Sequence, residues 1–370
     1  MLCDAKFAVT TPDSVGDLQV CGTGSSLPGP ALTIDEVLHR FGSQIPATQG
    51  KLARRVARRL QIRYRHIARA LVEPIEAVRP EDSGPRLAAR AIGEALRQAG
   101  ATVDSISFLI GHTATPHTLL PSNTAWTADE LNFAGPHIEL RQACTGFAAA
   151  TLLAGGLHCI GKRYIAIVGS ETGSVYFDPR RIAEDPGQIV NLAQMGDGAG
   201  AILLGPVQAA SASRIERPFF GSTGMGQQPG LLLTDGGAGS PSIATVGGAP
   251  SVPIFKHLHE TIKTNGIALL RASLEAAKST GINQMEVDWY LPHQANGRMA
   301  EICARYLDLP VDSVICSADT VGNLGSASIW VALDRLRRSG KLVIGDRVLV
   351  LGAEATKYLY GGFLYVHGTT

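Results

Sequence analysis

The second half of this 370-residue chain repeats the pattern of the first half. The apolar segment 287–293 ends in a histidine, as does segment 106–112, and each leads into a helical stretch and a further strand. A glycine turn that opens an apolar helix then follows in both halves. Each of these helices leads to a strand with a glycine near its end, at Gly169 and at Gly352. Strands alternating with helices, present twice, predict a duplicated α/β fold.

The glycine turn of the first half carries Cys144. A strand-like run, 138–140, precedes it, and a tract rich in alanine and leucine follows as far as Leu157. This tract predicts a helix, so we expect Cys144 beside a helix N-terminus. Unpaired N–H groups and the positive end of the helix dipole favour a thiolate there. The alternative is a buried cysteine that packs as a small apolar side chain.

Two polar residues occupy matching places in the second half. His293 ends a buried strand, and Asn323 lies in a glycine turn at the position that matches Cys144. Taken singly, the histidine is expected to be structural and the asparagine to be a turn residue. The duplication, however, places all three residues at one junction. We therefore expect one site, in which a cysteine attacks a thioester while a histidine and an amide donate hydrogen bonds to an enolate or oxyanion.

The composition limits the kinds of partner. Lys and Arg number 33 and Asp and Glu number 32, which argues against a nucleic-acid surface or a polybasic membrane anchor. No apolar run approaches the roughly 20 residues of a membrane span, and the first residues lack the layout of a signal peptide. The 6 cysteines are scattered without a CxxC pair, which indicates reduced thiols in a cytoplasmic enzyme and no metal site.

Five segments set the expected organisation. Residues 51–65 are densely basic. They form either a solvated helix face or a binding site for phosphates or for an acidic partner, and the near-neutral charge of the rest of the chain favours a binding site. Residues 1–17 are expected to form a loose leader. Residues 18–205 are expected to form the half with the cysteine, and residues 206–370 the half with the histidine and asparagine. The Gly-, Ser- and Pro-rich stretch 205–250 is expected to be surface loops.

The chain resembles the 3-oxoacyl-acyl carrier protein synthase III family of the thiolase superfamily, from Leu18 almost to its end. Asp-Trp-x-x-Pro-His-Gln-Ala-Asn at 288–296, with a correctly spaced cysteine and Gly-Asn, is a specific combination. Gly-Asp-Gly-Ala-Gly-Ala at 196–201 is weak by itself. The resemblance implies a five-layered α/β/α/β/α thiolase fold of two pseudo-symmetric halves, and a homodimer. Further matching blocks are Gly22–Pro28, Ile62–Ile67, Ala143–Phe147 and Gly322–Ser328.

The resemblance also implies roles for individual residues. Cys144 takes an acyl group from an acyl-CoA or an acyl carrier protein. His293 and Asn323 stabilise the enolate of a malonyl-type thioester, which attacks the acyl-cysteine. Asn323, in place of a second histidine, indicates the type III branch. CoA or phosphopantetheine thioesters are substrates, and no cofactor is implied. The positions that contact the pantetheine nucleotide or the carrier protein correspond to Arg59, Asn296 and Arg298.

Three places depart from the family pattern. Arg55 stands where a tryptophan stacks on the CoA adenine, which favours a carrier protein as acyl donor. Leu120 replaces a phenylalanine with which the partner subunit blocks the acyl pocket, so we expect room for a medium or long acyl chain. Residues 353–357, Ala-Glu-Ala-Thr-Lys, replace a glycine-rich loop that supplies an oxyanion-hole N–H. Their bulk and charge are expected to reshape the site.

The sequence therefore predicts a type III-like ketosynthase, an acyltransferase that performs a Claisen condensation with a malonyl- or β-ketoacyl-type thioester. We expect a role in secondary metabolism, such as the chain joining of dialkylresorcinol-forming enzymes. Three alternatives stay open: a fatty-acid-initiating synthase that uses a short acyl-CoA, a cysteine-dependent acyltransferase without carbon–carbon bond formation, and a non-catalytic ketosynthase-like subunit. The expected partners are a second copy of the chain, an acyl carrier protein and acyl-CoA.

Overall fold

The computed structural model describes most of the chain. Its described residues are 16–70, 78–161, 163–235, 237–239, 245–246, 249–250 and 252–369. The expected leader, residues 1–17, lies almost wholly outside these ranges, and the division of the chain at residues 205 and 206 stays a prediction. Within the described ranges, every helix is too short or too polar to cross a bilayer.

One mixed sheet of 9 strands runs through the described residues. Its strands are β1 Leu18–Ser26, β2 Ile106–His112, β3 His137–Leu140, β4 Tyr164–Glu171, β5 Gly198–Pro206, β6 Arg214–Ser222, β11 Trp289–Pro292, β12 Arg347–Glu354 and β13 Leu359–Val366. Two smaller ladders pair β7 with β10 and β8 with β9; these strands are β7 Leu231–Leu233, β8 Thr245–Val246, β9 Ala249–Pro250 and β10 Phe255–His257.

The strand order confirms the duplication. The first half contributes β1-β5-β4-β2-β3, and the second half contributes β6-β13-β12-β11 in the matching order. An isolated parallel bridge from Tyr290 of β11 to Val314 occupies the place that β3 has beside β2. The two half-sheets join where β1 pairs with β6, at Leu18 and Ile215.

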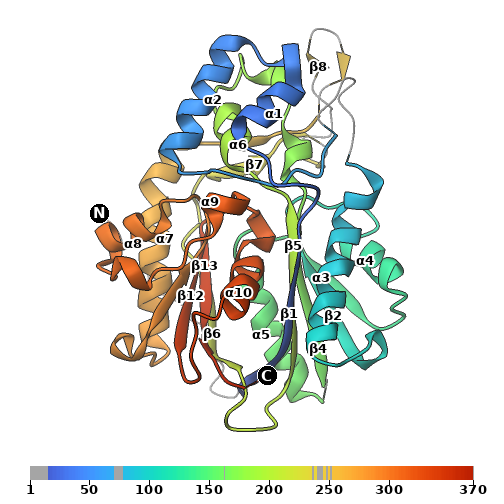
Figure 1. Ribbon diagram of the computed structural model, residues 1–370, viewed down its shortest axis with the longest axis vertical. Helices are drawn as coiled ribbons and strands as arrows, with labels where there is room; N and C mark the ends of the chain where they lie inside the picture. The colour runs from blue at the N-terminus through green and yellow to red at the C-terminus, as the bar shows by residue number, and fades with distance from the viewer. Residues whose placement is uncertain are drawn as a thin grey trace.

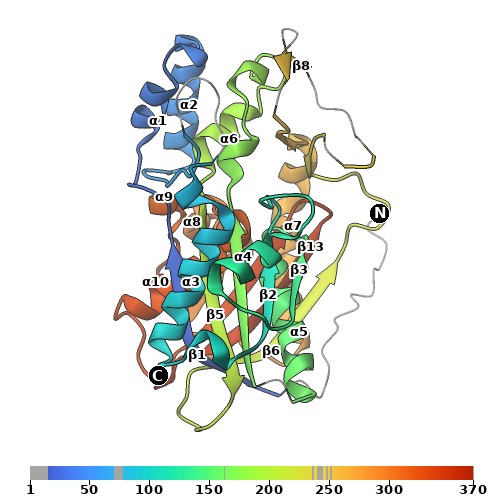
Figure 2. The same ribbon diagram turned by 90° about the vertical axis from the view of Figure 1, so that its right-hand side faces the viewer.

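The helices complete five layers, which Figure 1 shows nearly edge-on. From one side to the other these are α7 and α8, the second half-sheet, α5 with α10, the first half-sheet, and α3 with α4; Figure 2 looks onto α3 and α4. Helices α1, α2 and α6 form a cap at one end, at the top of Figure 1. The helices are α1 Ile34–Phe41, α2 Ala47–Arg59, α3 Gly84–Gln98, α4 Asn123–Leu131, α5 Gly146–Cys159, α6 Gln188–Gln194, α7 His259–Ser279, α8 Met299–Leu307, α9 Ala318–Val321 and α10 Ser328–Arg338.

The central layer is one apolar core shared by both halves. Phe147 of α5 meets Trp330 of α10 edge to face, with ring centroids 5.9 Å apart. Phe363 of β13 packs against both rings, at 5.7 Å and 6.0 Å. All three side chains are fully buried, as are core residues from both half-sheets. Burial of rings of this size is a large stabilising contribution, so neither half has a complete core without the other.

Local sequence signals explain where two of the helices begin. Thr33 and Glu36 form a capping box at the start of α1, and Ser122 caps α4. The interpretation of residues 205–250 as surface loops is wrong in one respect, because β6 lies between β13 and β1 in the sheet. Its alternation is obscured by Arg217, whose φ is +50°, and by a register irregularity opposite β13.

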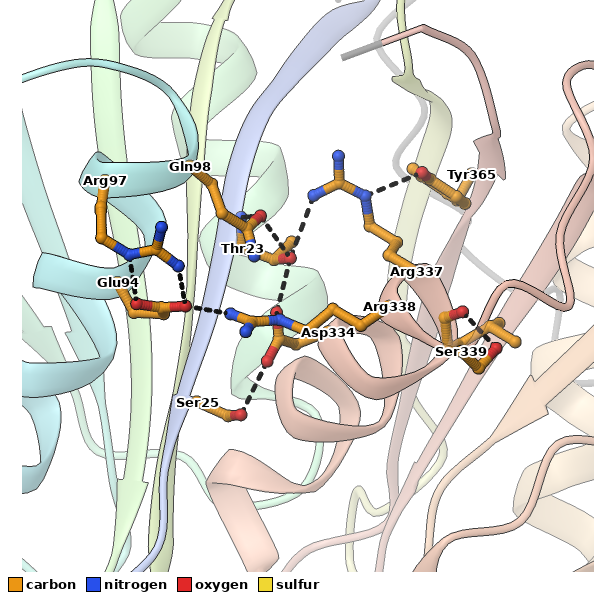
Figure 3. Close-up of polar contacts among 11 residues, drawn as sticks. Thr23, Ser25, Glu94, Arg97, Gln98, Asp334, Arg337, Arg338, Ser339 and Tyr365 are labelled. Carbon is orange, nitrogen blue, oxygen red and sulfur yellow. Dashed lines mark hydrogen bonds and ion pairs between the residues drawn. The ribbon is translucent and has the colours of Figure 1, made fainter.

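A polar network ties α10 to the first half (Figure 3). Asp334 is 1% exposed and accepts hydrogen bonds from Thr23 Oγ1 at 2.8 Å and from Ser25 Oγ at 2.7 Å, both on β1. Arg338 pairs with the same carboxylate at 3.0 Å and with Glu94 of α3 at 2.6 Å. Because donors from two elements converge on one buried carboxylate, α10 is held in a defined position against β1.

We expect Asp334→Ala to lower the free energy of unfolding by roughly 2 kcal/mol, because it removes the acceptor of two hydroxyl groups that stay near the core. Urea denaturation monitored by circular dichroism measures the change. The matched control is Asp312→Ala, an exposed carboxylate for which we expect a change within about 0.5 kcal/mol. Equal unfolding midpoints for the two variants would show that the network does not stabilise the fold.

Candidate active site

Cys144 lies where the sequence predicts, between β3 and the start of α5. Thr145 is the N-cap residue and Gly146 is the first residue of the helix. A side chain at Gly146 would not fit, since its Cβ would come within 2.4 Å of His112 Nδ1. This close packing of the turn holds the partly buried Cys144 at the junction of the two halves.

The prediction that the start of the helix favours a thiolate at Cys144 is wrong. The backbone N–H of Thr145 is not unpaired, because it donates to Glu354 Oε2 at 2.9 Å, and the Thr145 hydroxyl donates to the same oxygen at 2.7 Å. Burial, followed by the charges of Glu354 and Glu171, raises the pKa of the Cys144 thiol well above its ordinary value. A carboxylate at the start of α5 also offsets the positive end of the helix dipole. The resting side chain is therefore a thiol.

His293 lies directly after β11, at the end of the strand as predicted. Its backbone N–H donates to Leu351 O at 2.7 Å, which continues the pairing with β12. The next residue, Gln294, holds this segment, since its amide donates to Ile315 O at 3.1 Å and accepts from Ser317 N at 2.7 Å. The imidazole is 7% exposed, and its Nδ1 has no hydrogen-bond partner. Burial lowers the pKa of His293 to about 4, so the ring is neutral at pH 7.

Asn323 lies in the turn between α9 and α10. Its backbone N–H donates to Gln194 O at 2.8 Å, and its carbonyl accepts from Gly196 N at 3.0 Å. The turn of the second half is thus bonded to residues 194–196 of the first half, which precede β5. The side-chain Oδ1 accepts from Gly325 N at 3.0 Å, which leaves the amide NH2 as the donating end of the side chain.

Two glutamates that the sequence analysis did not single out as site residues lie at equivalent places. Glu354 ends β12 and accepts from Thr145, at the start of α5. Glu171 ends β4 and accepts from Ser326 N at 2.9 Å and Ser326 Oγ at 2.8 Å, just before α10. The sequence signal was present, because both glutamates stand two residues after the strand-ending glycines of the repeat. Each carboxylate comes from one half and holds the helix start of the other.

Contacts between chain segments link the three predicted residues to one junction. Ser326 Oγ also donates to Gln142 O at 3.2 Å, so the turn that carries Asn323 touches the segment that carries Cys144. His293 is bonded to β12, the same strand that reaches Thr145 through its terminal glutamate. The assignment of catalytic roles to the three residues stays a prediction.

His112, the counterpart of His293 in the first half, has a structural role. Its Nε2 accepts from Trp330 Nε1 at 2.9 Å, and the residue is almost fully buried. Burial lowers the pKa of His112 to about 3, so it is a neutral acceptor. The structure therefore distinguishes two histidines that the repeat makes equivalent.

The predicted carrier-binding residues also lie close together. The backbone N–H of Gly297, between Asn296 and Arg298, donates to the carbonyl of Leu60, which follows Arg59. Asn296 Oδ1 accepts from Arg298 N at 2.9 Å. A surface hollow beside this contact is lined by Ala57, Arg58, Gln61, Ile62, Arg63, Gly297, Cys316 and Asp319. The binding roles of Arg59, Asn296 and Arg298 stay predictions.

Leu120 lies in the loop before α4 and is 88% exposed, and its neighbour Leu119 is also exposed. An apolar side chain held out from the surface fits the predicted contact with a partner subunit, which stays a prediction. Among the described residues, no three His, Cys, Asp or Glu side chains are arranged to hold a metal ion.

The buried imidazole makes stability depend on pH. The folded pKa of His293 is about 4 and the ordinary value is 6.5, so below pH 6.5 the unfolded chain binds a proton that the folded chain does not. The free energy of unfolding is therefore expected to fall as the pH drops from about 6.5 toward 4, and to be independent of this group above that window.

In His293→Asn, we expect this dependence to be less steep by up to about 1.4 kcal/mol per pH unit. Urea denaturation at intervals from about pH 7.5 to about pH 4.5 measures both slopes. His112 contributes equally to both proteins, so the difference isolates His293. Parallel curves would mean that His293 is not buried in its neutral form.

Comparisons with known proteins agree with this geometry. The family model for the 3-oxoacyl-acyl-carrier-protein synthase III C-terminal region matches residues 277–363. The β-ketoacyl-acyl-carrier-protein synthase III of Desulfitobacterium hafniense is 30% identical over 349 residues, which cover 90% of this chain and 93% of that relative. The same enzyme from Sphingopyxis alaskensis is 28% identical over 344 residues, 89% of this chain and 98% of the relative.

Solved structures share the fold over almost the whole chain. The tetronic acid condensing enzyme AbyA1 superposes with a TM-score of 0.78 at 23% identity, covering 95% of this chain and all of that one. The priming β-ketosynthase of the R1128 polyketide pathway superposes with a TM-score of 0.75 at 25% identity, covering 95% and 97%. By its sequence over nine-tenths of its length and by its fold, this chain belongs to the β-ketoacyl-acyl-carrier-protein synthase III family.

Proposed function

We propose that the protein is a condensing enzyme that carries an acyl group on Cys144 and joins it to the α-carbon of a second thioester. The observation that supports this most is the convergence of a cysteine, a neutral buried imidazole and a side-chain amide at the junction of the two halves. A nucleophile with nearby donors is the arrangement that acyl transfer requires.

In the first step, the Cys144 sulfur attacks the thioester carbonyl. Because Cys144 is a thiol at rest, its proton has to leave as the carbon–sulfur bond forms, and the neutral imidazole of His293 is the base within the site. The backbone N–H of Cys144 stabilises the oxyanion. The tetrahedral adduct then collapses, the CoA or carrier thiolate leaves with that proton, and the acyl-cysteine remains.

In the second step, a malonyl- or β-ketoacyl-type thioester supplies a carbon nucleophile. Loss of CO2 or of an α-proton leaves an enolate, to which the His293 N–H and the Asn323 amide NH2 donate hydrogen bonds. The enolate carbon attacks the acyl carbonyl, and the bond to sulfur breaks. The sulfur leaves as a thiolate and takes up a proton, from solvent after decarboxylation or the removed α-proton otherwise, which restores the Cys144 thiol as the β-ketoacyl product leaves.

The proposed role is in secondary metabolism, with a medium or long acyl chain and chain joining of the dialkylresorcinol type. Two structural relatives are named for secondary metabolism, a tetronic acid condensing enzyme and a polyketide priming ketosynthase, and a third was solved with lauric acid and lauroyl-CoA. Leu120, smaller than phenylalanine, supports the longer chain. The curated relatives favour a second candidate, fatty-acid initiation from a short acyl-CoA.

The proposed acyl donor is an acyl carrier protein, which is an acidic protein. The proposed location of the reaction is the cytoplasm. Arg55, Arg58 and Arg59 are exposed on α2, and none of them forms an ion pair with a described carboxylate, whereas Arg54 on the same helix pairs with Asp35. Exposed cations without local partners attract an acidic protein. Arg58 lines the hollow beside Gly297, where a phosphopantetheine arm would enter.

The proposed assembly is a homodimer through β3, which is the edge strand of the first half-sheet. Ile138 on β3 and Leu153 on α5 are exposed apolar side chains. A hollow beside them is lined by Leu140, Ala149, Leu152 and Phe220, among others. An exposed edge strand with apolar neighbours favours pairing with a second copy.

Intact-mass spectrometry tests the proposed function. The protein is offered acyl-CoAs and acyl carrier proteins from acetyl to myristoyl, and we expect an acyl adduct that Cys144→Ala abolishes. His293→Ala should still accumulate the adduct, at a lower rate, while its condensation rate falls at least about 100-fold, the usual contribution of a catalytic proton-transfer or oxyanion group.

The outcomes separate the candidates. Loading of medium or long chains from carrier protein supports the specialised role, and loading of short acyl-CoA supports fatty-acid initiation. An adduct that passes to an amine or alcohol without a β-ketoacyl product would make the protein a plain acyltransferase. No adduct from any donor would overturn the proposal in favour of a non-catalytic subunit.

Charge reversal on α2 tests the donor. We expect Arg58→Glu with Arg59→Glu to weaken acylation from acyl carrier protein by about 10-fold or more, with a reduced salt dependence, because both side chains lie unpaired on the proposed docking face. Arg54→Glu, which alters an arginine already paired with Asp35, is the matched control with a smaller effect. Acylation from the free pantetheine thioester should be unchanged, and an equal loss there would contradict carrier docking.

A further inference from the structure

Glu354 places a buried carboxylate beside the nucleophile, within the segment that departs from the family's glycine-rich loop. It is 2% exposed, and its Oε2 accepts from the backbone N–H and the hydroxyl of Thr145. Its Oε1 accepts from the hydroxyl of Thr356. The two Thr145 contacts hold the peptide that follows Cys144, so the position of the sulfur depends on this carboxylate.

Glu171 is the counterpart of Glu354 in the repeat, and it acts on the other turn. It accepts from Ser326, three residues after Asn323, and it also approaches Gly325. Gly325 has a φ of +50°, and a Cβ there would come within 2.4 Å of Glu171 Oε2. Glu171 therefore holds the Asn323 turn, while Glu354 holds Cys144. Each carboxylate thus holds a different turn of the site.

The charged and titratable groups around the junction come from four elements. Glu354 comes from β12 and Glu171 from β4, and both are buried. His293, after β11, is neutral, and His112, at the end of β2, is held by Trp330. Among the described residues, no arginine or lysine forms an ion pair with either carboxylate, and the nearby Arg141 pairs with Glu139.

We propose that Glu354 is a positioning residue for Cys144, which fixes the Cys144–Thr145 peptide and, through its negative charge, keeps the sulfur protonated until a thioester and His293 are in place. The proposal rests on the proposed function in that Cys144 is the nucleophile and His293 is the base. It follows that the resting site holds no preformed thiolate. The sulfur loses its proton to the imidazole of His293 as the new carbon–sulfur bond forms.

The raised pKa of Cys144 agrees with this geometry, since Glu354 is the largest cause after burial. A resting thiol also has a consequence of its own. Thiols react with electrophiles and oxidants much more slowly than thiolates do. The charge of Glu354 therefore protects the nucleophile between turnovers. It also slows the attack of Cys144 on the thioester.

The test is the pH profile of alkylation at Cys144 by iodoacetamide, followed by peptide mass spectrometry so that each cysteine is read separately. Alkylation forms a carbon–sulfur bond, releases iodide and gives the thiol proton to the buffer, so its rate follows the thiolate fraction. It needs no acyl donor. The variants are Glu354→Gln, which keeps an acceptor oxygen for Thr145 without the charge, Glu354→Ala, which removes both, and the control Glu139→Gln.

We expect Glu354→Gln to shift the midpoint of the profile down by about one pH unit or more, which makes Cys144 roughly 10-fold more reactive near neutral pH. Glu139→Gln should leave the profile unchanged, because the negative charge of Glu139 is already paired with Arg141. Glu354→Ala should shift the midpoint too and also lower the acylation rate, because the Thr145 contacts are lost. The glutamine variant should recover part of that rate.

A profile in Glu354→Gln with the wild-type midpoint would overturn the proposal, whatever happens to the rate, because a purely structural residue would not move the midpoint. A shift that is equally large in Glu139→Gln would overturn it as well. The proposed function fails separately. If no donor acylates the protein while the alkylation midpoint still shifts, the charge effect of Glu354 stands and the condensation does not.

Discussion

The packing of α5 against α10 between two half-sheets is the constraint on which the rest of the structure depends. Phe147, Trp330 and Phe363 bring rings from both halves into one cluster, so each repeat completes the core of the other. Apolar burial is non-directional, and polar contacts set the register of the two halves. Asp334 fixes α10 on β1, and the turn at Asn323 is bonded to residues 194–196 of the first half.

The same arrangement creates the site. Two central helices that begin at one junction place their unpaired N–H groups together, and such groups need acceptors. Each half supplies one, Glu354 to the start of α5 and Glu171 to the turn before α10. These carboxylates satisfy the helix starts, but they also surround Cys144 with negative charge. A site that the helix dipole would make electropositive is thereby made unfavourable for a thiolate.

Much of the fold could be predicted from local patterns. The tract rich in alanine and leucine located α5, and the matching strand–histidine segments revealed the duplication because equivalent places need similar residues. The prediction failed at β6, where a left-handed Arg217 and a shift of register break the alternation on which strand prediction depends. It also failed at Cys144, because the carboxylate that pairs with the helix start comes from Glu354, far away along the chain.

The sequence by itself determined the repeat, the position of Cys144 between a strand and a helix, and the place of His293 at the end of a strand, since all of these follow from neighbours along the chain. Only the tertiary structure decided the protonation states. Burial made His293 a neutral ring and Cys144 a thiol, and the hydrogen bond from Trp330 made His112 structural. Charge and burial depend on what lies nearby in space, and the folded chain brings those groups from its opposite half.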